Sequence, residues 1–250
     1  MPVEECGNIL ILAYMYQSAS GDSAWAQKYS APFKQYADYL ALNGLYPTEQ
    51  LSTDDGAGSV SNQTGLAIKS AIALNAYGAM VGSSNYSSKG HEFAEVLCNQ
   101  SAGLDLDRTH FTLIQGNSSS WSMQFNLYLD VLLKLNTFPT EALAMQTSYY
   151  PTVRQESGVA LDSNVGIWGK TDWMIFAAAT AMAPGVSDEG VRDMFIDDVH
   201  AYMANGQNQV PFSDRYYVSN LLSCQSRQAN FCHRSPTVAA QMPQAISTAT

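Results

Sequence analysis

The sequence has few charged residues and no long apolar run, and these absences exclude several classes of protein. Charged residues make up 14% of the 250 residues, against roughly 25% in an average soluble domain. The 22 acidic residues outnumber the 12 basic ones, and the net charge is −10. Because no basic cluster is present, we expect no nucleic-acid partner. The longest apolar stretches are far shorter than the roughly 20 residues of a spanning helix, so we expect no membrane partner either.

Motifs for metal binding and for nucleophilic catalysis are also missing. No Cys-x-x-Cys pair occurs, which argues against a zinc ribbon or a thioredoxin-like site. Neither the Gly-x-Ser-x-Gly motif of hydrolases nor a Ser-x-x-Lys motif is present. The four histidines have no metal-ligand spacing and are expected to be surface or structural residues: His91, His110, His200 and His233. We therefore expect no metal and no cofactor.

Four sequons and the cysteines indicate a secreted protein. The Asn-x-Ser/Thr pattern marks candidate glycosylation sites, at Asn62, Asn85, Asn99 and Asn117. No signal peptide is visible, so we expect the chain to be a fragment of a larger secreted protein. In an oxidising compartment Cys224 and Cys232 could form a disulfide bond. Cys6 lies among apolar residues and is expected to be a buried, small hydrophobic residue.

Apolar residues recur mainly with helical spacing, which predicts an all-α fold. Local signals support this: the segment Gly21-Asp22-Ser23 ends one helix and caps the next. Only the segments "RTHFTLI" and "QVPFSDRYYV" look like short strands. The predicted helices span residues 4–19, 23–43, 63–82, 88–100, 121–136, 139–150, 171–183, 187–204 and 236–246.

Short and long connections alternate along the predicted helices. Long connections, at 44–62, 101–120, 151–170 and 205–235, follow the second helix of each pair, and loops of this length are usually functional or disordered. This plan is typical of an (α/α)6 toroid with short hairpin-like strands in its long loops. A complete double ring has twelve helices, and nine are predicted. We therefore expect one toroid domain over residues 1–250, incomplete at its N-terminal side, with a preceding region packed against the Met1 edge.

Acidic, amide and aromatic residues gather where the predicted inner helices begin, in the segments 2–8, 51–59, 119–126 and 168–176, and we expect these segments to lie on one rim. Carboxylates at helix N-termini are ordinarily explained by the helix dipole. Here they lie beside three of the four tryptophans, and an aromatic platform next to carboxylates suits a small polar ligand. Carboxylates can act as general bases or acids in hydrolysis. The candidate catalytic residues are Glu5, Asp54, Asp55 and Asp172.

Other polar and aromatic residues on the same rim are candidates for substrate binding. They share a place at the loop ends, and a fifth segment at 231–236 adds an arginine. A stacked structural tryptophan is the alternative for each aromatic member. The candidates are Glu4, Asn8, Trp121, Asn126, Lys170, Trp173 and Arg234.

Several blocks of sequence resemble a known family. They include "MPVEECGNILILAY", "YADYLALNGLYPTEQLSTDDGAG", "SWSMQFNLYLDVLLKLNTFP", "LDSNVGIWGKTDWMIFAAA" and "FCHRSPTVAA". In this order they resemble the C-terminal domain of the fungal glutaminase A family. The resemblance implies a secreted enzyme with an (α/α)6 toroid that hydrolyses L-glutamine to L-glutamate and ammonia. In that case Lys170 or Arg234 is the expected ligand of the substrate α-carboxylate, since arginine binds carboxylates bidentately.

Two other functions compete with this one. Toroids with acidic, Trp-rich mouths also process or bind glycans, so a carbohydrate-active module is the alternative by analogy of fold. A truncated, inactive helical fragment is the third possibility. Ammonia release from glutamine, measured beside sugar release from glycans, separates the first two.

Overall fold

The computed structural model describes residues 1–99, 102–207 and 212–223, and within them the chain is mostly helical. The long helices are α1 (Val3–Ser20), α3 (Ser30–Asn43), α4 (Thr64–Val81), α5 (Ser84–Cys98), α7 (Thr140–Val153), α8 (Thr171–Ala181) and α9 (Glu189–Ala204). The short elements are α2 (Ser23–Lys28), the 3-10 helix η1 (Asp55–Ala57), α6 (Leu127–Leu133) and the strands β1 (Trp168–Lys170) and β2 (Arg215–Tyr217). The all-α prediction is confirmed, and the predicted helix at 236–246 lies outside the described residues.

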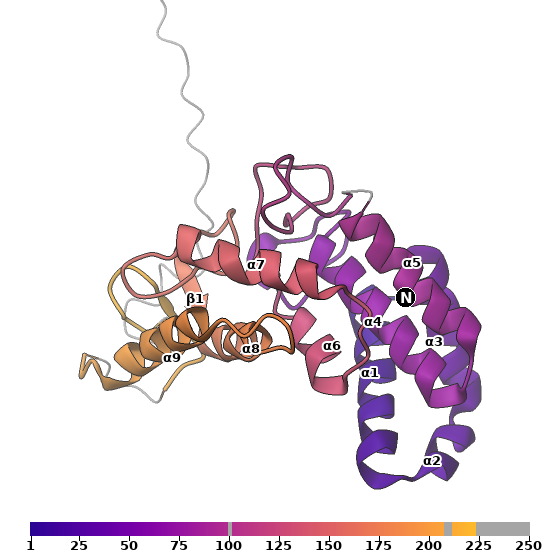
Figure 1. The fold of residues 1–250 in the computed structure, drawn as a ribbon. Coiled ribbons are helices and arrows are strands. Elements are labelled where there is room, and N and C mark those ends of the chain that lie inside the picture. Colours follow the sequence, from indigo (N-terminus) through magenta and orange to yellow (C-terminus); the bar gives the residue numbers. More distant parts are fainter. Residues whose placement is uncertain (100–101, 208–211, 224–250) are drawn as a thin grey trace, which may run out of the picture.

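The helices pack against one another in series along the chain. Helices α1 to α5 lie on one side of Figure 1 and α7 to α9 on the other, with α6 between them. Consecutive helices pair, α4 against α5 and α8 against α9. The first helix of each pair also contacts the next first helix: α1 contacts α4, α4 contacts α6, and α6 contacts α8. This serial contact places the N-terminal ends of four helices near one another.

Helix α4 is the centre of the larger of two hydrophobic cores. Its apolar residues run around the whole helix, a pattern typical of a helix that is buried on all sides. Helices α1, α3 and α5 cover it. On the α5 side the two backbones come very close at Gly90, where an added Cβ would lie 2.5 Å from the carbonyl oxygen of Ala71. Only glycine permits this approach.

Replacement of Gly90 with alanine is expected to lower the free energy of unfolding by about 1–3 kcal/mol, because the methyl group overpacks the α4–α5 contact. The control is Gly190→Ala in the first turn of α9, where an added Cβ meets only the Asp188 carboxylate at 3.4 Å. That change should be neutral or stabilise by up to about 1 kcal/mol. Chemical denaturation measures both. Equal effects of the two changes would contradict the close packing.

The predicted helix at 23–43 is wrong in one respect, because the chain forms two helices there, α2 and α3. The break lies at Tyr29, which has φ −106° and ψ 19°. The cause is Pro32. Proline has no N–H to donate, and in a continuous helix its ring would clash with the carbonyl group of Lys28. In the first turn of a new helix, where backbone N–H groups have no intrahelical partner, the same proline is tolerated.

Helix α6 is shorter than the predicted helix at 121–136. Residues before Leu127 form an irregular segment instead, in which Met123 N donates to Leu161 O at 2.7 Å. This pairing with a distant loop outweighs the local helical preference. At the other end Lys134 adopts φ 54° and terminates the helix.

The strand predictions are also corrected. Within "RTHFTLI" only isolated bridges form, from Phe111 to Leu104 and from Ile114 to Gln63. Among the described residues of the second segment, a strand forms at β2, which pairs antiparallel with β1, a strand that was not predicted. The small sheet therefore joins two long loops and is not a hairpin within one of them.

Among the described residues, no helix combines the length and apolarity that a bilayer span needs. Cys6 is a buried free thiol, as predicted, and Cys98 is another. Burial raises the pKa of the Cys98 thiol to about 12. The proposed Cys224–Cys232 disulfide lies outside the described residues. The expected preceding region at the Met1 edge stays a prediction.

Candidate active site

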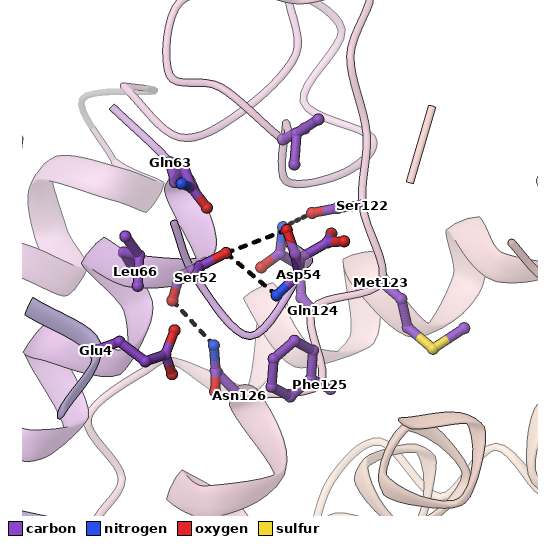
Figure 2. Close-up of a pocket in the computed structure, with 12 residues that line it drawn as sticks. Glu4, Ser52, Asp54, Gln63, Leu66, Ser122, Met123, Gln124, Phe125 and Asn126 are labelled. Carbon is purple, nitrogen blue, oxygen red and sulfur yellow. Dashed lines mark hydrogen bonds between the residues drawn. The ribbon is translucent and has the colours of Figure 1, made fainter. Parts of the chain in front are cut away.

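A narrow polar pocket lies where the N-terminal ends of α1, α4 and α6 meet the loop before η1. Figure 2 shows Glu4 on one side, Asp54 and Ser52 on another, and Asn126 between them. Its remaining lining comes from the start of α4 and the segment before α6: Gln63, Gly65, Leu66, Leu113, Ser122, Met123, Gln124 and Phe125. Of the segments expected on one rim, 2–8, 51–59 and 119–126 therefore meet at this pocket, whereas 168–176 does not line it and 231–236 lies outside the described residues.

Glu4 is held in the pocket wall by a buried ion pair. It lies in the first turn of α1 and is 5% exposed. One carboxylate oxygen accepts from the ammonium group of Lys69 on α4, and the other accepts from Thr53 N at 3.1 Å. Burial lowers the pKa of Lys69, because removal from water disfavours the ammonium, and the carboxylate beside it acts in the opposite direction. Gly7 leaves room for the lysine stem, since a Cβ there would lie 2.9 Å from Lys69 Cγ.

Asp54 meets a second carboxyl group behind the pocket. Its backbone is positioned by Ser52, whose Oγ accepts from Asp54 N at 3.2 Å. Asp162, in the loop before β1, is fully buried, and its carboxyl group lies within hydrogen-bond reach of Asp54. Burial raises the pKa of Asp162, although its Oδ1 accepts from the N–H groups of Asn164 and Val165 at 2.5 and 2.9 Å.

Asn126 provides an acceptor that its surroundings leave unused. The residue is 3% exposed, and its amide nitrogen donates to Gly65 O at 3.0 Å. Its Oδ1 is buried and receives no hydrogen bond from the described residues. A buried acceptor without a donor costs roughly 1–3 kcal/mol. An acceptor at this place, in the lining of the pocket, can bind an N–H group of a ligand.

The structure corrects three of the predicted roles. Glu5 is exposed and lies outside the pocket. Adjacent residues on a helix point in different directions, and here the side chain of Glu4 is the one that points into the pocket. The carboxylate of Asp172 is half exposed and pairs with Lys170 at 3.1 Å. Trp173 is 2% exposed and belongs to the second hydrophobic core, where it stacks on Phe125 with ring centroids 3.9 Å apart. The expected common pocket of these three residues with Asp54 therefore does not form.

The other predicted substrate ligands lie around the pocket or beyond it. Asn8 and Trp121 are half-buried and do not line it. Lys170 is engaged by Asp214 at 2.5 Å and lies over the Trp173 ring, so its ammonium is already compensated. Asp55 opens η1 directly after Asp54, and its side chain lies outside what the structure describes. Arg234 and the segment 231–236 also fall outside the described residues.

Sequence reasoning missed Lys69 and Asp162. A signal for Lys69 was present, since it is the one charged residue in the apolar stretch "LAIKSAIALNAY". An isolated lysine on a helix that is otherwise apolar needs a buried partner. Asp162 lies in "LDSNVG", a loop sequence in which an Asp side chain can accept hydrogen bonds from backbone N–H groups a few residues later. No local signal indicates that it meets Asp54.

Of the four histidines, His91, His110 and His200 do not line the pocket, and His233 lies outside the described residues. His110 is buried and stacks on Tyr149, with ring centroids 3.9 Å apart, which is a structural role. Among the residues that the structure describes, no three His, Cys, Asp or Glu side chains gather as metal ligands. The expectation of a reaction without a metal or cofactor stays a prediction.

Comparison with known proteins identifies the family. Residues 1–240 match the model of the glutaminase A six helical-hairpin domain. The chain is 34% identical over 227 residues to glutaminase A of Aspergillus oryzae. The aligned region covers 86% of this chain and 31% of that protein. It is 26% identical over 224 residues to a probable glutaminase of Arthroderma benhamiae, covering 77% of this chain and 25% of that protein. The chain thus spans about a third or less of these relatives, and it belongs to the glutaminase A family.

Proposed function

We propose that the chain is part of a glutaminase that hydrolyses L-glutamine to L-glutamate and ammonia, and that the Glu4–Asp54–Asn126 pocket binds the substrate. The observation that carries this proposal is the unused Oδ1 of Asn126 beside a carboxyl group, in a chain of the glutaminase A family. A carboxamide or ammonium N–H group of the substrate supplies the missing donor. Glutamine carries both kinds of group, and the pocket lining adds the amides of Gln63 and Gln124 and the hydroxyls of Ser52 and Ser122.

Hydrolysis of the amide requires one proton to be removed and one to be delivered. A water molecule attacks the carboxamide carbon and loses a proton, and the C–N bond then breaks as the nitrogen receives a proton and leaves as ammonia. Asp54 is the group we assign to both transfers, because it borders the pocket and its carboxyl group is hydrogen-bonded to that of Asp162. It gives the proton that it holds to the nitrogen and takes the proton of the water in exchange, so it acts as both general acid and general base and ends the cycle protonated.

Glu4 and Lys69 have a supporting role in this scheme. Both oxygens of Glu4 are engaged by Lys69 and Thr53, which makes it a weak base. Its place is fixed by the same bonds, and its carboxylate oxygens keep further acceptor sites for the substrate ammonium. We therefore keep Glu4 as a substrate-binding residue and, of the four catalytic candidates, assign catalysis to Asp54.

The architecture is proposed to be an (α/α)6 toroid, and the protein to be secreted. The serial contacts of α1, α4, α6 and α8 agree with an inner ring of helices, and the pocket at their N-terminal ends agrees with a mouth. The sequons support the secreted location.

The proposed activity is tested by ammonia release from L-glutamine. Because the relatives are longer, the assay uses the chain alone and a chimera in which residues 1–240 replace the matching segment of the Aspergillus oryzae glutaminase A. We expect the chimera to release ammonia from L-glutamine and no reducing sugar from a panel of glycans. A folded chimera that binds no glutamine and releases no ammonia would overturn the proposal. Sugar release would support the carbohydrate-active alternative instead.

Three of the four sequon asparagines are exposed and open to glycosylation: Asn85, Asn99 and Asn117. Asn62 differs. It is half-buried with φ 57°, and its backbone bonds to Pro47 and Gln115 hold it in place. Expressed through a eukaryotic secretory pathway, the chain should carry glycans at the first three sites and little at Asn62. Peptide mass spectrometry after deglycosylation in ¹⁸O-water measures the occupancy. Full occupancy at Asn62 alone would contradict the expectation.

A further inference from the structure

Asp162 is a buried carboxyl group that the family assignment does not explain. Its side chain is fully buried in the loop before β1. Oδ1 accepts two backbone N–H groups, whereas Oδ2 receives no hydrogen bond from any N–H or hydroxyl group among the described residues. The group beside it is the carboxyl of Asp54. The loops that hold the two residues pack tightly, since an added Cβ at Gly56 would lie 2.7 Å from Val165 Cγ2.

Two carboxyl groups in contact away from water cannot both be ionised at ordinary cost. When two carboxyl groups lie within hydrogen-bond reach, the negative charge of one raises the proton affinity of the other. One proton is therefore retained between them. The retained proton turns one of the two into the donor of a hydrogen bond to the other. This explains how Asp162 Oδ2 can be buried without a donor from elsewhere in the described chain.

We propose that Asp54 and Asp162 share a single proton at neutral pH, and that Asp162 is a positioning residue that sets the proton affinity of Asp54. The two backbone N–H groups on Oδ1 stabilise negative charge on Asp162, which leaves the shared proton on the side of Asp54. Asp54 in turn borders the pocket, whereas Asp162 has no access to it. The sharing itself requires only this geometry, and its use in catalysis rests on the proposed function.

Among the described residues, Glu4 and Lys69 are the charged groups that lie near the pair on the pocket side. Glu4 of α1 faces the same pocket, and its charge is compensated by Lys69 of α4. The segment before α6 contributes Ser122, Gln124 and Asn126, which do not titrate. A carboxyl group whose pKa is raised on folding keeps its proton in the folded chain after the unfolded chain has lost it. Its contribution therefore makes stability fall as pH rises from the unfolded pKa, near 3.8, toward neutrality.

The experiment on the chain alone is infrared spectroscopy of protonated carboxyl groups at neutral pH. Wild type and Asp107→Asn, an exposed aspartate in the turn after α5, should show the band of the shared proton. Asp54→Asn and Asp162→Asn should both lose it, because the remaining carboxyl group ionises beside an amide donor. Any band of Asp130, whose pKa burial also raises, stays in all four proteins. A wild type without the band, or an Asp162→Asn variant that keeps it, would overturn the proposal.

Stability and activity provide two further readouts. Between about pH 4 and pH 7 the fall in stability with pH should be shallower in Asp162→Asn than in wild type or Asp107→Asn. In the chimera, Asp162→Asn should lower kcat at least tenfold and leave KM for glutamine within about twofold. Wild-type activity should fall at high pH, where the shared proton is released, and this fall should be absent from the pH profile of Asp162→Asn. An unchanged pH profile would contradict the positioning role. An inactive wild-type chimera would contradict the proposed function and leave the infrared result to decide on the shared proton.

Discussion

Replacement of Asp54 with asparagine is expected to lower kcat for glutamine hydrolysis in the chimera by about 10²–10⁴-fold, the range that general acid–base catalysis contributes. Asparagine keeps the shape of the side chain and can still donate a hydrogen bond to Asp162, but it can neither accept a proton from water nor give one to ammonia. The folded state should therefore be retained. Ammonia release measures the rate, and circular dichroism and thermal unfolding measure the fold.

The matched control for this change is Asp107→Asn, which makes the same chemical replacement at an exposed site away from the pocket. It should leave the rate within about twofold of wild type. If Asp54→Asn keeps near wild-type turnover, Asp54 only orders the loop before η1. A large loss of thermal stability in Asp54→Asn would also speak against the assignment, because the lower rate would then reflect unfolding.

Replacement of Lys69 with methionine is expected to lower the free energy of unfolding by about 3–5 kcal/mol, because it leaves the Glu4 carboxylate buried without its cation. Both side chains of the pair are less than 10% exposed, so water cannot take over the role of the lysine. Methionine fills much of the same volume, and a lost contact surface therefore explains little of the effect. Chemical denaturation of the chain itself gives the measurement.

Two further variants separate the ion pair from other causes. Lys89→Met removes the cation of an ion pair with Glu92 on the surface of α5, and should change stability by no more than about 1 kcal/mol. The double variant Glu4→Gln, Lys69→Met replaces both charges and should recover a large part of the loss. If Lys69→Met costs no more than Lys89→Met, the buried pair does not have the role we describe.

The helices could be predicted from the sequence because their signals are local. Gly21 adopts φ 72° as the C-cap of α1, and Asp22 accepts from Trp25 N as the N-cap of α2. The segment before α6 could not be predicted in this way, because its backbone bonds to residues 161–163, far along the chain. Pro32 is the exception, since its effect on the helix at 23–43 is local and was overlooked.

The rim of the pocket was also within reach of the sequence, but the role of each residue was not. Acidic and amide residues at the loop ends identified Glu4, Asp54 and Asn126 as candidates. Between Glu4 and Glu5 the sequence offers no choice, because the inward direction depends on how α1 packs against α4. The shared proton depends on Asp162, and its partner is separated from it by α4, α5, α6 and α7.

The pocket is held together by contacts between residues that are far apart in the sequence, and this has a consequence for the order of folding. Glu4 pairs with a residue 65 positions later and accepts from a backbone N–H group 49 positions later, whereas the helices are held by bonds between near neighbours. Contacts of high sequence separation carry a loop-closure cost and form late. The helical hairpins should therefore assemble first and the pocket last. A partly folded chain in a refolding experiment would have most of its helical circular dichroism while glutamine still has no site to bind.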